Sequence, residues 1–338
     1  MDLDKLTWTD VRDFGVTGKG WTDTEHFYDR FPARAKDVIS PDLWERSRHA
    51  AGLRVHFLTD SPVIAADWTV LKEPIYGDKM GCSCVSGLDL YVRHNGRWRW
   101  CAMTWPDTPG RTRKSLIQEM PAGQHEYMLY LPLMNWLDSI AIGIAPDARL
   151  DKPEPQPGKP ILFYGTSIVH GGCASRTGMT YPALLSRRFD RPFIGLGFGG
   201  QGRMELEVAK LLAELDPCVY VVDPLPNLQP DEVTERTEPF VHILRDARPE
   251  TPIVLVESIV YQDSPFVPSH DERYKASNRA LKAALARLLD AGVTGLHYVE
   301  GEDLLGQDGE GTVDGVHPTD VGFMRIADVL APVLEPLI

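Results

Sequence analysis

The sequence has no run of apolar residues long enough to cross a membrane. A transmembrane helix needs about 18 or more predominantly apolar residues in a row, and no stretch of this chain approaches that length. The first 14 residues are acidic and polar, and they lack the apolar core of a secretory signal. We therefore predict a mature protein that resides in the cytoplasm and has no membrane partner.

Cysteine is scarce and odd in number. The five cysteines are Cys82, Cys84, Cys101, Cys173 and Cys218. A sparse, odd set fits a reducing compartment better than a framework of disulfides. Cys82 and Cys84 are separated by one residue, and no second close pair is present to complete a zinc site. The pattern predicts buried or idle thiols and no bound metal.

Basic residues are fewer than acidic ones. The chain of 338 residues carries 35 Lys and Arg against 48 Asp and Glu, which gives a formal net charge of −13. With a pI near 5.2 and no dense Lys/Arg run, it has no bulk attraction for nucleic acid. Hydrophobic residues make up 43% and charged residues 25%. These values are ordinary for globular proteins and exclude a disordered chain, a collagen and a coiled coil.

The length suits two domains, and a proline-rich stretch marks the boundary between them. Residues 151–160 contain four prolines and one glycine. Such a segment forms neither a helix nor a central strand, so it is interpreted as a stiff linker. We predict an N-terminal domain over residues 1–150, the linker over 151–160 and a second domain over 161–338.

The segment before the linker contains many short apolar runs bounded by turn residues. No long amphipathic helix is evident there. Short strands at this spacing predict an antiparallel β-sandwich, similar to a jelly roll. The candidate strands are residues 53–58, 63–71, 86–92, 97–104, 127–131 and 140–144.

The segment after the linker alternates between apolar runs and helical patterns. The runs are residues 160–164, 192–196, 218–222, 252–256 and 295–299. The helical patterns are residues 181–189, 204–215, 233–246, 272–291 and 320–334. This alternation predicts a five-stranded parallel sheet covered on both faces by helices, a flavodoxin-like α/β/α domain. Ligands of such sheets bind beyond the carboxyl ends of the strands.

Polar residues and glycines follow four of these five strands. Ser167 follows the first strand, a glycine cluster at residues 197–202 follows the second, and Asn227 follows the third. His317 follows the fifth, three residues after Asp314. A carboxylate at that spacing can accept the Nδ1–H of the imidazole, which leaves Nε2 as a base.

Each signal alone has an ordinary structural explanation. Ser167 could be a helix N-cap, the glycines a flexible turn, and Asn227 a turn residue. Asp314 could be a surface carboxylate beside an unrelated His317. Taken together, they supply a nucleophile, oxyanion donors and a base with its orienting carboxylate. This chemistry needs no cofactor, metal or nucleotide. His170, three residues after Ser167, has two interpretations: a residue that lines the pocket, or, as we favour, a residue on the side of the helix with a local hydrogen bond.

These residues resemble the SGNH, or GDSL-like, hydrolase superfamily. The resemblance is greatest to its two-domain members, in which a β-sandwich with a Gly-x-Asp-Leu-Tyr signature precedes the hydrolase domain. Gly87-Leu88-Asp89-Leu90-Tyr91 matches that signature, so the resemblance covers nearly the whole chain. Two positions depart from the pattern. Thr166 stands where the GDSL motif has Asp, and residues 225–228 read Leu-Pro-Asn-Leu instead of Gly-x-Asn-Asp.

The resemblance implies a catalytic triad and an oxyanion hole. The implied catalytic residues are Ser167, Asp314 and His317. The implied oxyanion donors are the backbone N–H groups of Ser167 and Gly200 and the side chain of Asn227, with Gly199 as the alternative glycine. Members of the family deacylate small esters, often on sugars, and some related proteins transfer acyl groups.

Three functions remain open from the sequence. The first is a serine esterase acting on a small carboxylic ester, with an acylated carbohydrate as one candidate substrate. The second is an acyltransferase that uses the same triad with an alcohol acceptor. The third is a glycan-binding protein with a vestigial triad, against which the intact Ser167, Asp314 and His317 argue.

Overall fold

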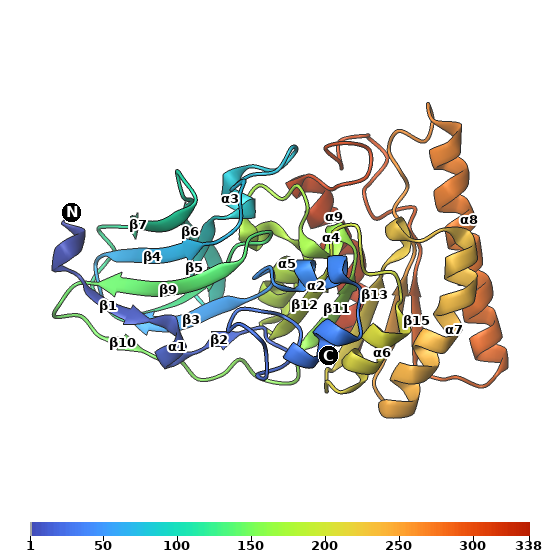
Figure 1. The fold of residues 1–338 in the computed structure, drawn as a ribbon, viewed down its shortest axis with the longest axis horizontal. Helices are drawn as coiled ribbons and strands as arrows, with labels where there is room; N and C mark the ends of the chain where they lie inside the picture. Colours follow the sequence, from blue (N-terminus) through green and yellow to red (C-terminus); the bar gives the residue numbers. More distant parts are fainter. Residues whose placement is uncertain (1) are drawn as a thin grey trace. The chain divides into compact units, whose positions relative to one another are not determined.

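The computed structural model describes residues 2–338, which form two compact units (Figure 1). The first unit comprises the chain up to Ala33, Ser47–Gln156 and Ser175–Gly178. The second comprises Arg34–Arg46, Pro157–Ala174 and Met179–Ile338. Two segments thus belong to a different unit from the residues on either side of them in the sequence. Arg34–Arg46 packs in the second unit, where Arg34 forms an ion pair with Glu214. Ser175–Gly178 packs in the first unit.

The first unit contains two antiparallel sheets. One has the strand order β1-β9-β4-β7, and the other has the order β10-β3-β8-β5-β6, with β2 paired to β3. The strands are β1 Thr7–Asp10, β2 Val16–Thr17, β3 Arg54–Thr59, β4 Ile64–Val70, β5 Leu88–His94, β6 Arg97–Thr104, β7 Gly110–Ile117, β8 His125–Tyr130, β9 Leu137–Ile144 and β10 Leu150–Asp151. The short helical turns are η1 Leu3–Lys5, α1 Val11–Phe14 and α3 Cys82–Val85.

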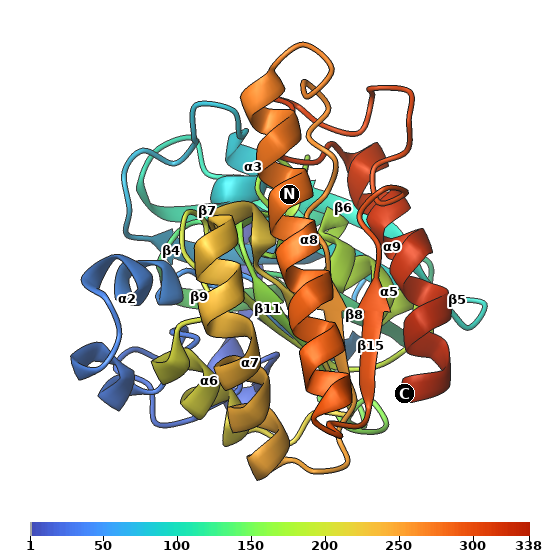
Figure 2. The same cartoon turned by 90° about the vertical axis from the view of Figure 1, so that its right-hand side faces the viewer.

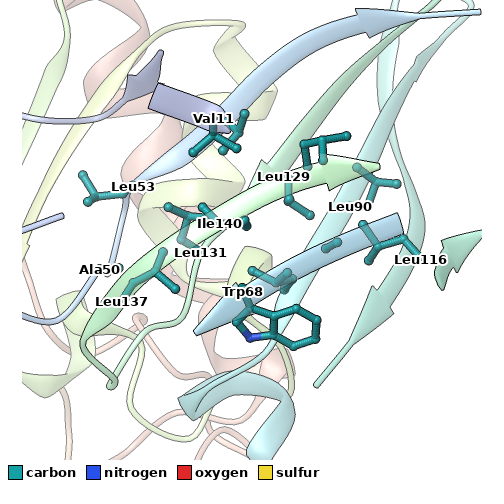
Figure 3. Close-up of a cluster of buried hydrophobic side chains, with 14 of the residues drawn as sticks. Val11, Ala50, Leu53, Trp68, Leu90, Leu116, Leu129, Leu131, Leu137 and Ile140 are labelled. Atoms are coloured by element: carbon teal, nitrogen blue, oxygen red, sulfur yellow. The ribbon is translucent and has the colours of Figure 1, made fainter. Parts of the chain in front are cut away.

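Side chains from both sheets form one apolar core (Figure 3). Trp68 and Ile140 come from β4 and β9 of one sheet, and Leu90 and Leu129 come from β5 and β8 of the other. All four are fully buried or nearly so. Two sheets that enclose a shared core form a sandwich, so the predicted antiparallel class of this segment is confirmed.

The Gly-x-Asp-Leu-Tyr signature binds the returning segment Ser175–Gly178 within the first unit. A side chain at Gly87 would place its Cβ 2.3 Å from the carbonyl oxygen of Ser83, so only glycine fits there. The buried Asp89 carboxylate accepts hydrogen bonds from Arg176 Nη1 at 2.7 Å, the Gly178 N–H at 2.9 Å and Trp100 Nε1 at 3.0 Å. The signature therefore supplies a buried carboxylate, Asp89, that binds the guanidinium of Arg176 and the backbone N–H of Gly178.

We expect Asp89→Asn to lower the free energy of unfolding by about 3 kcal/mol, because it removes one partner of a buried ion pair and leaves Arg176 uncompensated. Urea denaturation measures this loss. The control is Asp107→Asn, which breaks the exposed ion pair with Lys114 and should cost less than about 1 kcal/mol. Equal losses in the two variants would contradict this role for Asp89.

The second unit contains a five-stranded parallel sheet with the order β12-β11-β13-β14-β15. Numbered along this unit alone, the order is 2-1-3-4-5, which is the flavodoxin-like arrangement. The predicted fold class is thus confirmed. The strands are β11 Ile161–Gly165, β12 Phe193–Gly197, β13 Val219–Asp223, β14 Ile253–Val256 and β15 Leu296–Val299.

Helices cover both faces of this sheet. The connection from β11 to β12 runs one way along the sheet, and the connections from β12 to β13, β14 and β15 run the other way. Right-handed crossovers therefore place α5 on one face and α6, α7 and α8 on the other. Helix α9 packs beside α5, and α7 packs between α6 and α8 (Figures 1 and 2). The helices are η2 Ala33–Asp37, α2 Pro41–Ser47, α4 Ser167–His170, η3 Thr177–Met179, α5 Tyr181–Phe189, α6 Leu206–Ala213, η4 Leu225–Asn227, α7 Pro230–Ala247, α8 Pro268–Asp290, α9 Asp320–Leu334 and η5 Glu335–Leu337.

None of the helices within residues 2–338 has the length and apolar character needed to span a bilayer. None of the five cysteines forms a disulfide within the described residues, and Cys84 is fully buried.

Candidate active site

The central strand β11 leads directly into the turn that carries Ser167. Every residue of β11 is buried, because β12 and β13 flank it in the sheet and helices cover both faces. Thr166 then caps helix α4, because its Oγ1 accepts the N–H of Ile168 at 3.2 Å. Threonine is a good N-cap residue, which explains how it can stand where the GDSL motif has Asp. Ser167 follows as the first residue of α4, and its N–H has no hydrogen-bond acceptor within residues 2–338.

Ser167, His317 and Asp314 form a continuous chain of hydrogen bonds. The Ser167 Oγ lies 2.9 Å from His317 Nε2, and His317 Nδ1 lies 2.8 Å from Asp314 Oδ2. A carboxylate only accepts hydrogen bonds, so Nδ1 carries the proton in this pair and Nε2 is free to accept the hydroxyl of Ser167. Residues 150 positions apart are thereby joined in the geometry of a nucleophile and its base.

The turn that carries Asp314 and His317 is fixed by its own hydrogen bonds. Asp314 Oδ1 accepts the N–H groups of His317 at 2.8 Å and Val316 at 3.1 Å. The Gln262 N–H donates to the Gly315 carbonyl at 2.9 Å, and Thr312 Oγ1 donates to Gln262 Oε1 at 2.9 Å. The loop after β14 therefore holds the turn through Gln262. Together these bonds leave the imidazole of His317 little freedom to rotate.

The glycine cluster after β12 forms a tight turn beside Ser167. Residues 198–201 make a β-turn, closed by the Gln201 N–H donating to the Phe198 carbonyl at 3.0 Å. Gly200 is the third residue of the turn and has φ +70°, a value that favours glycine. The Phe198 N–H donates to the Gly165 carbonyl at 3.0 Å, and the Gly199 N–H donates to His170 Nδ1 at 3.3 Å.

These bonds distinguish the two candidate glycines. In the part of the chain that the structure describes, each N–H from Phe198 to Gln201 has an acceptor except that of Gly200. An oxyanion donor must have a free N–H to offer. Gly200 meets this requirement and Gly199 does not.

Asn227 is the last residue of η4. It directly follows Pro226, and Pro224 lies two residues further back. Its Nδ2 donates to the Gln201 carbonyl at 2.5 Å. Two hydrogens are available on this nitrogen. One holds the glycine turn, and the other, which has no acceptor within residues 2–338, remains for a ligand. The loops after β12 and β13, which carry the predicted oxyanion residues Gly200 and Asn227, are thus joined by a direct hydrogen bond between Asn227 and Gln201.

Two buried groups near these loops were not singled out from the sequence. The Tyr164 hydroxyl donates to Glu205 Oε2 at 2.6 Å and accepts the Met204 N–H at 3.0 Å, which anchors the far end of the glycine loop. Burial holds the pKa of Tyr164 well above its usual value. At the end of β13, burial raises the pKa of Asp223 to about 7, and the Tyr181 hydroxyl lies 3.0 Å from its carboxylate.

Comparison with known proteins places the chain in a family. The family described as GDSL-like Lipase/Acylhydrolase matches residues 158–335, and the GxDLY family, described as N-terminus of Esterase_SGNH_hydro-type, matches residues 6–150. No curated protein matches the chain. A protein from Bacteroides ovatus ATCC 8483, whose crystal structure carries the description GDSL-like lipase, is 35% identical over 98% of both chains, with a TM-score of 0.92.

Two more distant structures share the fold. The salicylyl-acyltransferase SsfX3 from a tetracycline biosynthetic pathway is 20% identical over 98% of both chains, with a TM-score of 0.79. The acetyl xylan esterase Est2A from the rumen bacterium Butyrivibrio proteoclasticus is 12% identical over 98% of both chains, with a TM-score of 0.63.

The fold and the family matches define a two-domain hydrolase that acts on ester bonds. The chain belongs to the GDSL-like lipase/acylhydrolase family and carries the GxDLY N-terminal domain that occurs with SGNH-type esterases. The resemblance inferred from the sequence motifs is confirmed.

Proposed function

We propose that the protein is a serine esterase that hydrolyses a small carboxylic ester through an acyl-enzyme. The observation that carries this proposal is the unbroken contact from Ser167 Oγ to His317 Nε2 and from His317 Nδ1 to Asp314. A serine hydroxyl is a weak nucleophile until a neighbouring base takes its proton. The orientation of His317 provides that base in the required tautomer.

The first half-reaction forms the acyl-enzyme. Ser167 Oγ attacks the ester carbonyl carbon while His317 Nε2 takes the hydroxyl proton, and the carbonyl π electrons move onto oxygen. The Ser167 N–H, the Gly200 N–H and the free Asn227 Nδ2–H stabilise that oxyanion. The intermediate then expels the alcohol, which takes the proton from His317, and Asp314 stabilises the transient imidazolium.

The second half-reaction releases the acid. Water attacks the acyl carbon, His317 accepts a proton from it, and the bond to Ser167 Oγ breaks as the proton returns to that oxygen. An alcohol in place of water would give a new ester, which is the acyltransferase alternative. The substrate class is a small ester of a carboxylic acid, with an acylated sugar as the candidate natural form.

A panel of p-nitrophenyl esters of increasing acyl length tests this proposal, together with acetylated monosaccharides. We expect turnover that favours acetate and yields free acid. The same reactions are run with glycerol as an added acceptor and their products are separated. Ester exchange that exceeds hydrolysis would favour the transferase. Absence of turnover on every ester, or turnover that does not depend on Ser167, would overturn the proposal.

Asn227→Ala should lower kcat by about 10²–10³-fold, which is the usual cost of removing one oxyanion donor. The KM should change little, because the donor acts mainly on the charge that develops in the transition state. Steady-state kinetics and thermal unfolding of the variant measure the two quantities. Ester turnover near the wild-type rate would remove Asn227 from the mechanism.

A further inference from the structure

His170 is a buried residue of the candidate site that the mechanism above does not use. The residue is 1% exposed. It ends the helix that Ser167 begins, α4, which is labelled in Figure 1. Residues three apart in a helix lie on the same face. Ser167 and His170 therefore point toward the same side of α4, where the glycine turn of residues 198–201 runs.

The contact between His170 and this turn defines the protonation of the imidazole. The Gly199 N–H donates to His170 Nδ1 at 3.3 Å. A backbone N–H can only donate, so Nδ1 is an acceptor and carries no proton. His170 is thus held as the tautomer that is protonated on Nε2, the opposite of the tautomer that Asp314 imposes on His317.

Gly199 lies beside the candidate nucleophile as well as beside His170. A Cβ built at Gly199 would lie 3.7 Å from the Ser167 Cβ and 4.0 Å from His170 Nδ1. Two consecutive glycines have more backbone freedom than any other pair, so contacts from outside must fix their orientation. Asn227 holds the end of this turn through Gln201, and His170 holds its second residue.

We propose that His170 is a positioning residue of the oxyanion hole, which fixes Gly199 so that the neighbouring Gly200 N–H points toward the substrate oxygen. The inference rests on the proposed function and extends it to a residue that touches no reacting atom. An error of about 1 Å in the position of a catalytic group can cost about 10²-fold in rate. His170 would prevent such an error in the Gly200 N–H, which has no acceptor among the described residues.

The test compares His170→Asn with His170→Leu. The two new side chains have the same branched shape, but the Oδ1 of Asn lies where Nδ1 was and can accept the Gly199 N–H, whereas Leu has no acceptor. We expect kcat on p-nitrophenyl acetate to be about 10–100-fold lower for His170→Leu than for His170→Asn, with KM values within about threefold. Affinity for phenylboronic acid, which forms a tetrahedral adduct with serine, should fall in parallel.

Equal kcat values for the two variants, after thermal unfolding shows that both fold, would overturn the inference, because only the hydrogen-bond acceptor distinguishes them. If His170→Leu does not fold, the wild-type protein supplies the test. Nitrogen-15 NMR of its histidines should find His170 Nδ1 unprotonated and Nε2 protonated, and a proton on Nδ1 would refute the proposal. Failure of the proposed function gives a different result: the wild-type protein would then show no ester turnover that depends on Ser167.

Discussion

Replacing Ser167 by alanine is expected to lower kcat for ester hydrolysis by about 10⁶-fold. It is also expected to abolish the covalent adduct that a fluorophosphonate forms with the wild-type protein. The hydroxyl of Ser167 is the group that His317 Nε2 faces at 2.9 Å, and alanine leaves that base without a nucleophile to activate. Intact-protein mass spectrometry detects the adduct, and p-nitrophenyl acetate hydrolysis gives the rate.

The matched control for this variant is Ser277→Ala in helix α8 of the same unit. Ser277 is buried, and its Oγ has no hydrogen-bond partner within residues 2–338. Its removal should leave both labelling and turnover near wild type. Stoichiometric labelling of Ser167→Ala, or turnover within tenfold of wild type, would show that another residue is the nucleophile.

The parallel sheet could be predicted from the sequence because its strands are continuous apolar runs. β11, β12 and β13 are buried at every position, as strands covered on both faces must be. The predicted helices at residues 181–189 and 320–334 have the bounds of α5 and α9. Helix α8 begins at Pro268, four residues before the predicted start, because proline is well accommodated in the first turn of a helix.

The sandwich was predicted less completely, and β7 shows why. Gly110–Ile117 reads Gly-Arg-Thr-Arg-Lys-Ser-Leu-Ile, which has little apolar alternation. The strand lies at the edge of its sheet, and its Arg111 and Arg113 pair with Asp67 of β4. Edge strands with charged residues are common because they limit aggregation, but their sequences resemble those of loops. β1, β2 and β10 were likewise missed, and two of these have only two residues.

The residues of the candidate site could be predicted from their place after the strands, but their contacts could not. Motif and position pointed to Ser167, Asp314 and His317, which the structure joins by hydrogen bonds. The sequence left Gly199 and Gly200 as alternatives, because the choice depends on which N–H is already bonded. A local hydrogen bond was predicted for the His170 side chain, but the partner that the structure gives its Nδ1 is the Gly199 N–H, 29 positions away. Such a partner becomes visible only when β11 and β12 are paired.

Replacing Asp314 by asparagine is expected to lower kcat by about 10⁴-fold while preserving the turn. In the wild type, Asp314 Oδ1 accepts two backbone N–H groups and Oδ2 accepts the proton of His317 Nδ1. Because only the oxygen of an Asn side chain can accept those backbone N–H groups, its NH₂ must face Nδ1. The imidazole then carries its proton on Nε2 and cannot take the proton of Ser167, and a triad in the wrong tautomer loses about 10⁴-fold in rate.

The matched control is Asp263→Asn, since Asp263 forms the same kind of pair with His270 Nδ1 at 2.9 Å in the loop after β14. It removes an equal charge from the same region but leaves the tautomer of His317 unchanged, so we expect less than a fivefold effect. Steady-state kinetics of both variants, with nitrogen-15 NMR of the His317 ring, separates the two causes. Comparable losses in the two variants would mean that negative charge near the turn, and not the tautomer of His317, limits the reaction. A proton found on Nε2 in Asp314→Asn, together with a rate near wild type, would instead remove His317 as the base.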